Sequence, residues 1–130
     1  MKNLLMKVAV ATIGIVLVGI AIGVLTGSLA FGHASLVESN VKNGQVFSLA
    51  DVPGQIKLKF SEHLSKRSTL YVVKLGEDII VDKGDLVIDE ETMAISVSVL
   101  KTGVYQIRWI AVDEEEAGFR EGVITFSVKL

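Results

Sequence analysis

The strongest constraint on the fold is a series of short apolar runs, separated by turn-forming residues, over residues 56–128. In the first run, Ile56, Leu58 and Phe60 alternate with Lys57 and Lys59. This alternation is typical of a strand with one buried face. The same kind of pattern predicts six further strands, at residues 70–75, 79–82, 86–88, 94–99, 104–112 and 123–128.

Turn signals at residues 76–78, 83–85 and 101–103 separate these runs, and each contains a glycine. About seven short strands at even spacing favour an all-β fold, a Greek-key β-sandwich of the immunoglobulin-like or cupredoxin-like kind. Within residues 104–112, Trp109 falls on the same face as Tyr105 and Ile107. The plainest interpretation of Trp109 is therefore a core residue that fills space between the sheets.

The N-terminal segment has the layout of an export signal. Lys2 and Lys7 precede an uncharged apolar stretch over residues 8–31, and this order directs the following chain out of the cytoplasm. The stretch is longer than the about 7–15 apolar residues of most signals, and about 20 suffice to span a bilayer. We therefore predict a signal peptide or an uncut signal-anchor helix over residues 1–32, and an exported β domain over residues 33–130.

Composition excludes several classes of function. Because Lys2 and Lys7 account for two of the 13 basic residues, the exported part has 11 against 15 acidic residues, a net charge of −4. Nucleic acid is thus not an expected partner. There is no cysteine, which excludes disulfides and thiol catalysis. With two histidines, no Ser-His-Asp order and no glycine-rich phosphate loop, the chain is not expected to be an enzyme.

His33 is the first residue of the predicted exported domain. If a peptidase cuts after Gly32, His33 carries a free α-amine beside its imidazole, and these are two neutral nitrogen ligands on one residue. Such ligands suit copper(II). The prediction depends on the cleavage site, because an uncut leader removes the amine and a cut after Ala34 removes the residue.

Four segments resemble the CopC-type periplasmic copper-resistance domain family. They are HASLVES at 33–39, IKLKFSE at 56–62, GVYQIRW at 103–109 and GVITFSV at 122–128, and they extend over nearly the whole exported domain. The resemblance implies an exported copper(II)-binding protein that buffers, sequesters or delivers copper outside the cytoplasm. It also implies a membrane copper transporter of the CopD type as a partner.

The family's copper ligands match this chain only in part. The resemblance implies the amine and imidazole of a terminal histidine, the glutamate of the FSE motif, and an Asp-x-His segment between the last two strands. His33 and Glu62 fit the first two positions. In place of Asp-x-His the chain reads DEEEAG at 113–118, so Glu115 or Glu116 would replace the aspartate and the second imidazole is missing there.

His63, the only other histidine, directly follows Glu62. It is either a solvated loop residue or the relocated second imidazole. Neighbours in an extended strand point to opposite faces, so both side chains can bind one metal only if the chain turns at Glu62.

Several alternatives to a copper-buffering role stay open. The acidic run at 113–116 is also explained as a solvated loop, and carboxylates without His33 would favour calcium. A terminal-histidine copper centre also occurs in enzymes that oxidise polysaccharides. Finally, loss of the Asp-x-His pair would leave a membrane-anchored interaction module of the same fold.

Overall fold

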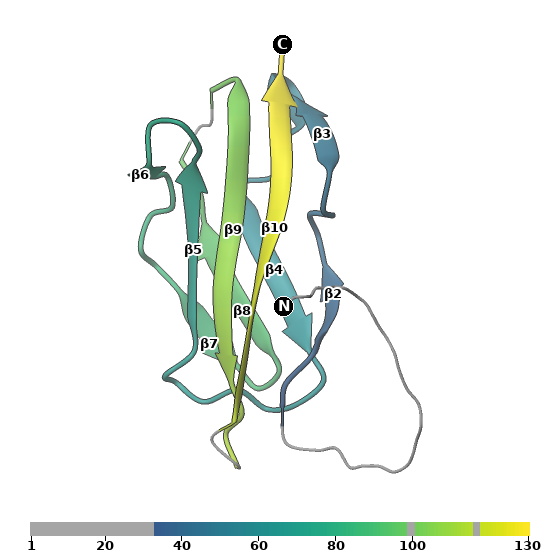
Figure 1. Ribbon diagram of the computed structural model, residues 1–130, viewed down its shortest axis with the longest axis vertical. Helices are drawn as coiled ribbons and strands as arrows, with labels where there is room; N and C mark the ends of the chain where they lie inside the picture. The colour runs from purple at the N-terminus through teal and green to yellow at the C-terminus, as the bar shows by residue number, and fades with distance from the viewer. Residues whose placement is uncertain (1–32, 99–100, 116–117) are drawn as a thin grey trace, which may run out of the picture. The chain divides into compact units, whose positions relative to one another are not determined.

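The computed structural model describes residues 33–98, 101–115 and 118–130, and in this part of the chain nine strands form two facing sheets (Figure 1). The five-stranded sheet has the order β3 (Gln45–Ser48), β10 (Phe119–Lys129), β9 (Gly103–Val112), β5 (Thr69–Lys74) and β6 (Ile79–Ile80). The four-stranded sheet has the order β2 (Leu36–Ser39), β4 (Gln55–Phe60), β8 (Thr92–Ser96) and β7 (Val87–Asp89). The prediction of an all-β, two-sheet fold is confirmed.

The structure has two strands more than the seven predicted. Both lie between residues 36 and 48: β2 is bulged between Leu36 and Glu38, and β3 runs parallel to β10. Their apolar residues Val37 and Val46 are 62% and 55% exposed, so these segments lack the inward alternation that marked the other strands. Long-range pairing, rather than local pattern, makes them strands.

The predicted N-terminal helix at residues 1–32 lies outside the described residues. In the described ranges, a short 3-10 turn at Leu49–Asp51 is the only helical element. In these same ranges, no helix is long and apolar enough to cross a bilayer.

The core lies between the sheets and follows the alternation seen in the sequence. Ile56, Leu58 and Phe60 on β4 are at most 1% exposed. Across from them, the ring of Phe126 stacks on Tyr105 with centroids 5.4 Å apart and meets the edge of Phe47 at 5.9 Å. Each such buried side chain contributes roughly 1.5–3 kcal/mol, so this aromatic group carries much of the stability.

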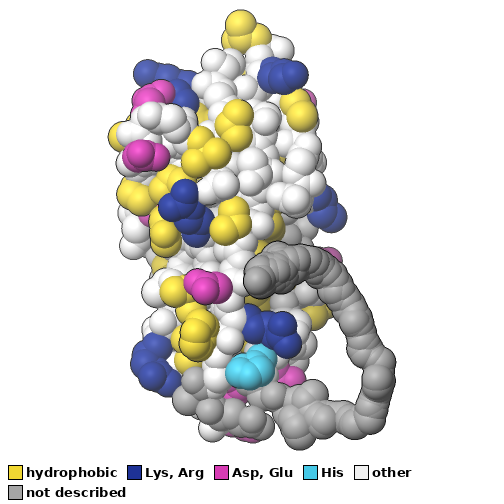
Figure 2. Space-filling view, in the orientation of Figure 1, with side chains coloured by type: hydrophobic (Ala, Val, Ile, Leu, Met, Phe, Trp, Pro, Cys, Tyr) yellow, Lys and Arg dark blue, Asp and Glu magenta, His cyan; other side chains and the backbone are white. Residues whose placement is uncertain are grey.

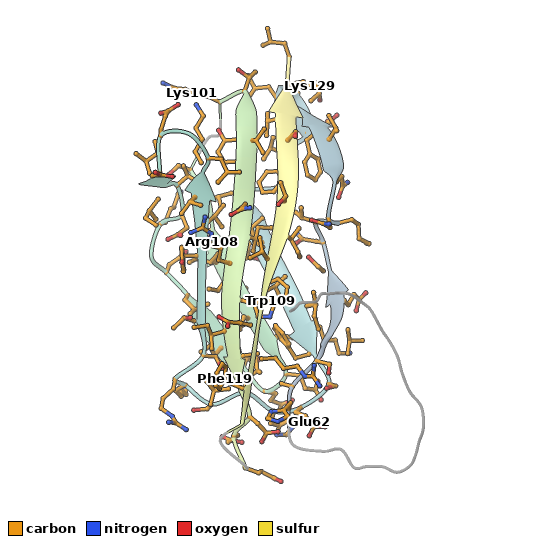
Figure 3. The ribbon with its side chains drawn as sticks, viewed as in Figure 1. Glu62, Lys101, Arg108, Trp109, Phe119 and Lys129 are labelled. Atoms are coloured by element: carbon orange, nitrogen blue, oxygen red, sulfur yellow. The ribbon has the colours of Figure 1, made fainter. Side chains whose placement is uncertain are left out.

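Trp109 is 9% exposed and packs edge-on against Phe60, with ring centroids 6.2 Å apart, so its predicted core position is confirmed (Figure 3). Its partner across the β9–β10 ladder is Gly122. The indole ring extends over the inner side of that glycine, where a Cβ atom would overlap the ring. Gly122 is therefore required by close packing, since the Trp109 ring occupies the space that any side chain would need.

Replacing Gly122 with alanine is expected to destabilise the domain by about 1–3 kcal/mol, because the added methyl displaces the Trp109 ring from a packed core. Gly54→Ala is the matched control, since nothing lies within 4 Å of a Cβ at Gly54. Urea unfolding followed by tryptophan fluorescence measures both variants. Equal unfolding midpoints for the two would contradict the close approach of Trp109 to Gly122.

Candidate metal centre

Three connections meet at one end of the sandwich, where Figure 3 labels Glu62. They are the chain that follows β4, the turn between β7 and β8, and the start of the β9–β10 connection. Backbone hydrogen bonds fasten them together: the Leu64 N–H donates to the Glu90 carbonyl at 2.8 Å, and the Glu114 N–H donates to the His63 carbonyl at 3.0 Å. The backbone thus holds the three connections side by side.

These connections surround a hollow of about 290 Å³, named here the acidic hollow. All of its lining side chains are polar and four of them are carboxylates: Ser61, Glu62, His63, Glu91, Asp113 and Glu115. Clustered carboxylates create a negative potential that attracts cations. Three of the site residues predicted from the sequence, Glu62, His63 and Glu115, are therefore brought together here.

The chain leaves the strand geometry just before the two predicted neighbours. β4 ends at Phe60, Ser61 and Glu62 form a bend, and Leu64 makes an isolated bridge with Asp113. Because the chain bends there, Glu62 and His63 both line the acidic hollow. The His63 side chain is 57% exposed, so its imidazole is accessible to a metal ion from solvent.

Asp113 has a position in the structure that the sequence analysis did not assign. It is 3% exposed, its Oδ1 accepts a hydrogen bond from the Glu115 N–H at 2.8 Å, and its own N–H donates to the Gly118 carbonyl at 2.8 Å. Asp113 therefore fixes the backbone that carries Glu115. In the sequence, Asp113 continues the period-two pattern of Trp109 and Ala111. This pattern could have placed the Asp113 side chain on the inner face.

Glu91 is the second residue that the sequence analysis missed. It comes from the turn between β7 and β8, and its Oε2 lies 4.0 Å from Nε2 of His63. No pattern in the sequence joins a turn at residue 91 to the segment after β4, because their proximity results from the pairing of β4 with β8.

His33 is exposed and begins the described part of the chain, although it does not line the acidic hollow. Two residues later, the Ser35 N–H donates to Oγ of Ser61 and the Ser61 N–H donates to the Ser35 carbonyl, both at 2.9 Å. The chain runs antiparallel to β4 here. His33 therefore lies at the same end of the sandwich as Glu62. Figure 2 shows histidine and charged side chains on the surface at this end.

Glu116, the other proposed replacement for the family aspartate, lies outside the described residues. Within the described ranges, no three His, Asp or Glu side chains converge closely enough to hold a metal ion in their present positions. The donor types at this end of the sandwich fit copper(II), because the imidazole of His63 lines the hollow beside the carboxylates and that of His33 lies at the same end. Without the nitrogens the same hollow would fit a hard cation.

Comparison with models of protein families identifies the family of this chain. The family model described as the CopC domain matches residues 36–129. Among curated proteins no relative matches. The matched range includes Glu62, His63 and the whole acidic run, and it begins three residues after His33.

Two solved structures share the fold. CopC from Methylosinus trichosporium OB3b superposes with a TM-score of 0.61 at 18% sequence identity, covering 75% of this chain and 94% of that one. PcoC, a copper resistance protein from Escherichia coli, superposes with a TM-score of 0.58 at 27% identity, covering 73% and 99%. The family model matches most of the length of this chain, and the β-sandwich superposes on both solved structures. The chain therefore belongs to the CopC domain family.

Proposed function

We propose that this protein binds copper(II) outside the cytoplasm and buffers, sequesters or delivers it as part of copper homeostasis or resistance. The observation that carries the proposal is the gathering of Glu62, His63 and Glu115 around one hollow, at the end of the sandwich where the segment from His33 runs beside β4. A relative at 27% identity is described as a copper resistance protein. The copper ion is the cargo of the protein, and no chemical step is required of the residues that hold it.

Each proposed ligand has a distinct part. The α-amine and imidazole of His33 form a chelate that needs no folded structure, once the leader has been cut after Gly32. Glu62 supplies an oxygen, and one of His63, Glu115 or Glu116 completes a tetragonal set of the kind copper(II) prefers. His63 would stand in for the missing second imidazole of the family motif.

The setting of the function follows from the leader. A cut leader would release the domain on the outer side of the cytoplasmic membrane, whereas an uncut stretch over residues 8–31 would anchor it there. A membrane copper transporter of the CopD type is the proposed recipient of the copper.

The test is a copper(II) titration of residues 33–130, followed by electron paramagnetic resonance, beside the same domain with the α-amine of His33 acetylated. We expect one-to-one binding with nitrogen hyperfine structure in the first protein. Acetylation removes the α-amine as a ligand and should weaken binding at least about 100-fold, which is roughly 2.7 kcal/mol. Weak binding of the same strength in both proteins would rule out the terminal-histidine site.

A further inference from the structure

Backbone hydrogen bonds join the turn between β7 and β8 to the residues on both sides of the Glu62–His63 segment. Only two residues, Glu90 and Glu91, separate the paired residues Asp89 and Thr92. The Glu90 carbonyl accepts from the Leu64 N–H at 2.8 Å, and the Glu91 carbonyl accepts from the Phe60 N–H at 2.8 Å. The backbone of Glu91 is therefore held at a fixed place beside the bend that carries His63.

The two glutamates of this turn have different surroundings. Glu90 has a φ of 56°, in the left-handed region where two-residue hairpin turns usually have asparagine or glycine, and it does not line the acidic hollow. Glu91 does line the hollow. The turn thus directs one carboxylate toward the proposed centre, while its neighbour provides a control of the same charge.

The Glu91 carboxylate faces one particular atom of the His63 ring. Its Oε2 lies 4.0 Å from Nε2, with the Glu91 side chain 40% exposed and the His63 side chain 57% exposed. This is the upper limit of an ion-pair distance and longer than a hydrogen bond, and both side chains are exposed enough to change rotamer. Histidines that bind metals commonly donate their other ring N–H to a carboxylate, which fixes the ring and makes the ligating nitrogen more basic.

We propose that Glu91 is a positioning residue for His63 at the copper centre. Its carboxylate accepts a hydrogen bond from the Nε2–H of His63 and leaves Nδ1 free to bind copper(II). This inference rests on the proposed function, and it assigns to the β7–β8 turn a part that the family's ligand set does not contain.

A double-mutant cycle tests the inference on the domain that begins at His33, with copper(II) affinity measured by competition against a chelator of known strength. Glu91→Ala should weaken binding by about 10–100-fold, the usual cost of removing the carboxylate that orients a ligating histidine. In the His63→Ala background, the same change should weaken binding by less than about threefold, because the group through which Glu91 acts is already gone. Glu90→Ala, with the same loss of charge in the same turn, should leave the affinity within about threefold of wild type.

Two results would overturn the inference. One is an equal effect of Glu91→Ala with and without His63, which would make Glu91 act independently of the imidazole. The other is equal losses for Glu90→Ala and Glu91→Ala, which would reduce both to a general effect of charge. If the unmodified domain binds copper tightly and the cycle fails in one of these ways, the proposed function stands. If the unmodified domain does not bind copper, the proposed function has failed first.

Discussion

Copper(II) at a hundredfold excess over its dissociation constant is expected to raise the unfolding temperature of the domain starting at His33 by up to about 10–20 °C. Ligand binding to the native state alone at this excess contributes about 2.7 kcal/mol, and 1 kcal/mol moves the unfolding temperature of a domain of this size by about 4–8 °C. Calorimetry with and without copper measures the shift.

The size of the shift reports on the folded ligands rather than on His33. The amine and imidazole of His33 chelate copper in the unfolded chain as well, and binding to both states cancels in the stability. Ligands that need the fold to come together, such as Glu62, His63 and Glu115 around the acidic hollow, favour the native state. The double variant Glu62→Gln with His63→Ala should therefore lose most of the shift and still show nitrogen hyperfine structure from His33. Copper bound by the unmodified domain without any shift would mean that these side chains do not converge on the metal.

Replacing Phe126 with alanine is expected to lower the free energy of unfolding by about 3–5 kcal/mol, the usual cost of removing a buried phenylalanine. Phe126 is 1% exposed and lies between the rings of Tyr105 and Phe47. A domain of this size has a total stability of about 5–15 kcal/mol, so the variant approaches the limit of folding. Urea unfolding measures the loss.

Phe119→Ala is the matched control for this change, because it makes the same substitution on the same strand at a side chain that is 56% exposed (Figure 3). It should cost less than about 1 kcal/mol, within the range of intrinsic strand preference. Similar losses at Phe119 and Phe126 would contradict the placement of the core between the two sheets.

The strands with clear alternation could be predicted from the sequence, because their pattern records burial residue by residue. β4 is the plainest case: Ile56, Leu58 and Phe60 are buried, while Lys57 and Lys59 are exposed. β2 and β3 could not be predicted, because they are short strands at sheet edges with exposed apolar residues. Their place depends on pairing with β4 and β10, which no local pattern encodes.

The residues of the candidate site could likewise be predicted only in part. His33 and Glu62 could be identified because each stands in a short stretch of sequence that resembles the family. Whether His63 shares a hollow with Glu62 depended on the bend at Ser61, and the nearness of Glu91 to His63 depended on the register of β4 against β8. Loop conformation and long-range register are set by the whole domain, so single-sequence reasoning could list the candidate ligands and could not choose among them.

The partial pairing of β3 with β10 has a consequence for solubility. β3 pairs with β10 only from Phe126 to Lys129 (Figure 1), so among the described residues the first half of β10 forms a sheet edge. A free edge can recruit a strand from another molecule, which is a common route to aggregation, and charged side chains suppress it. Arg120 and Glu121 lie on this half, both exposed. These two charges make the open half of β10 a poor template for a strand from another molecule.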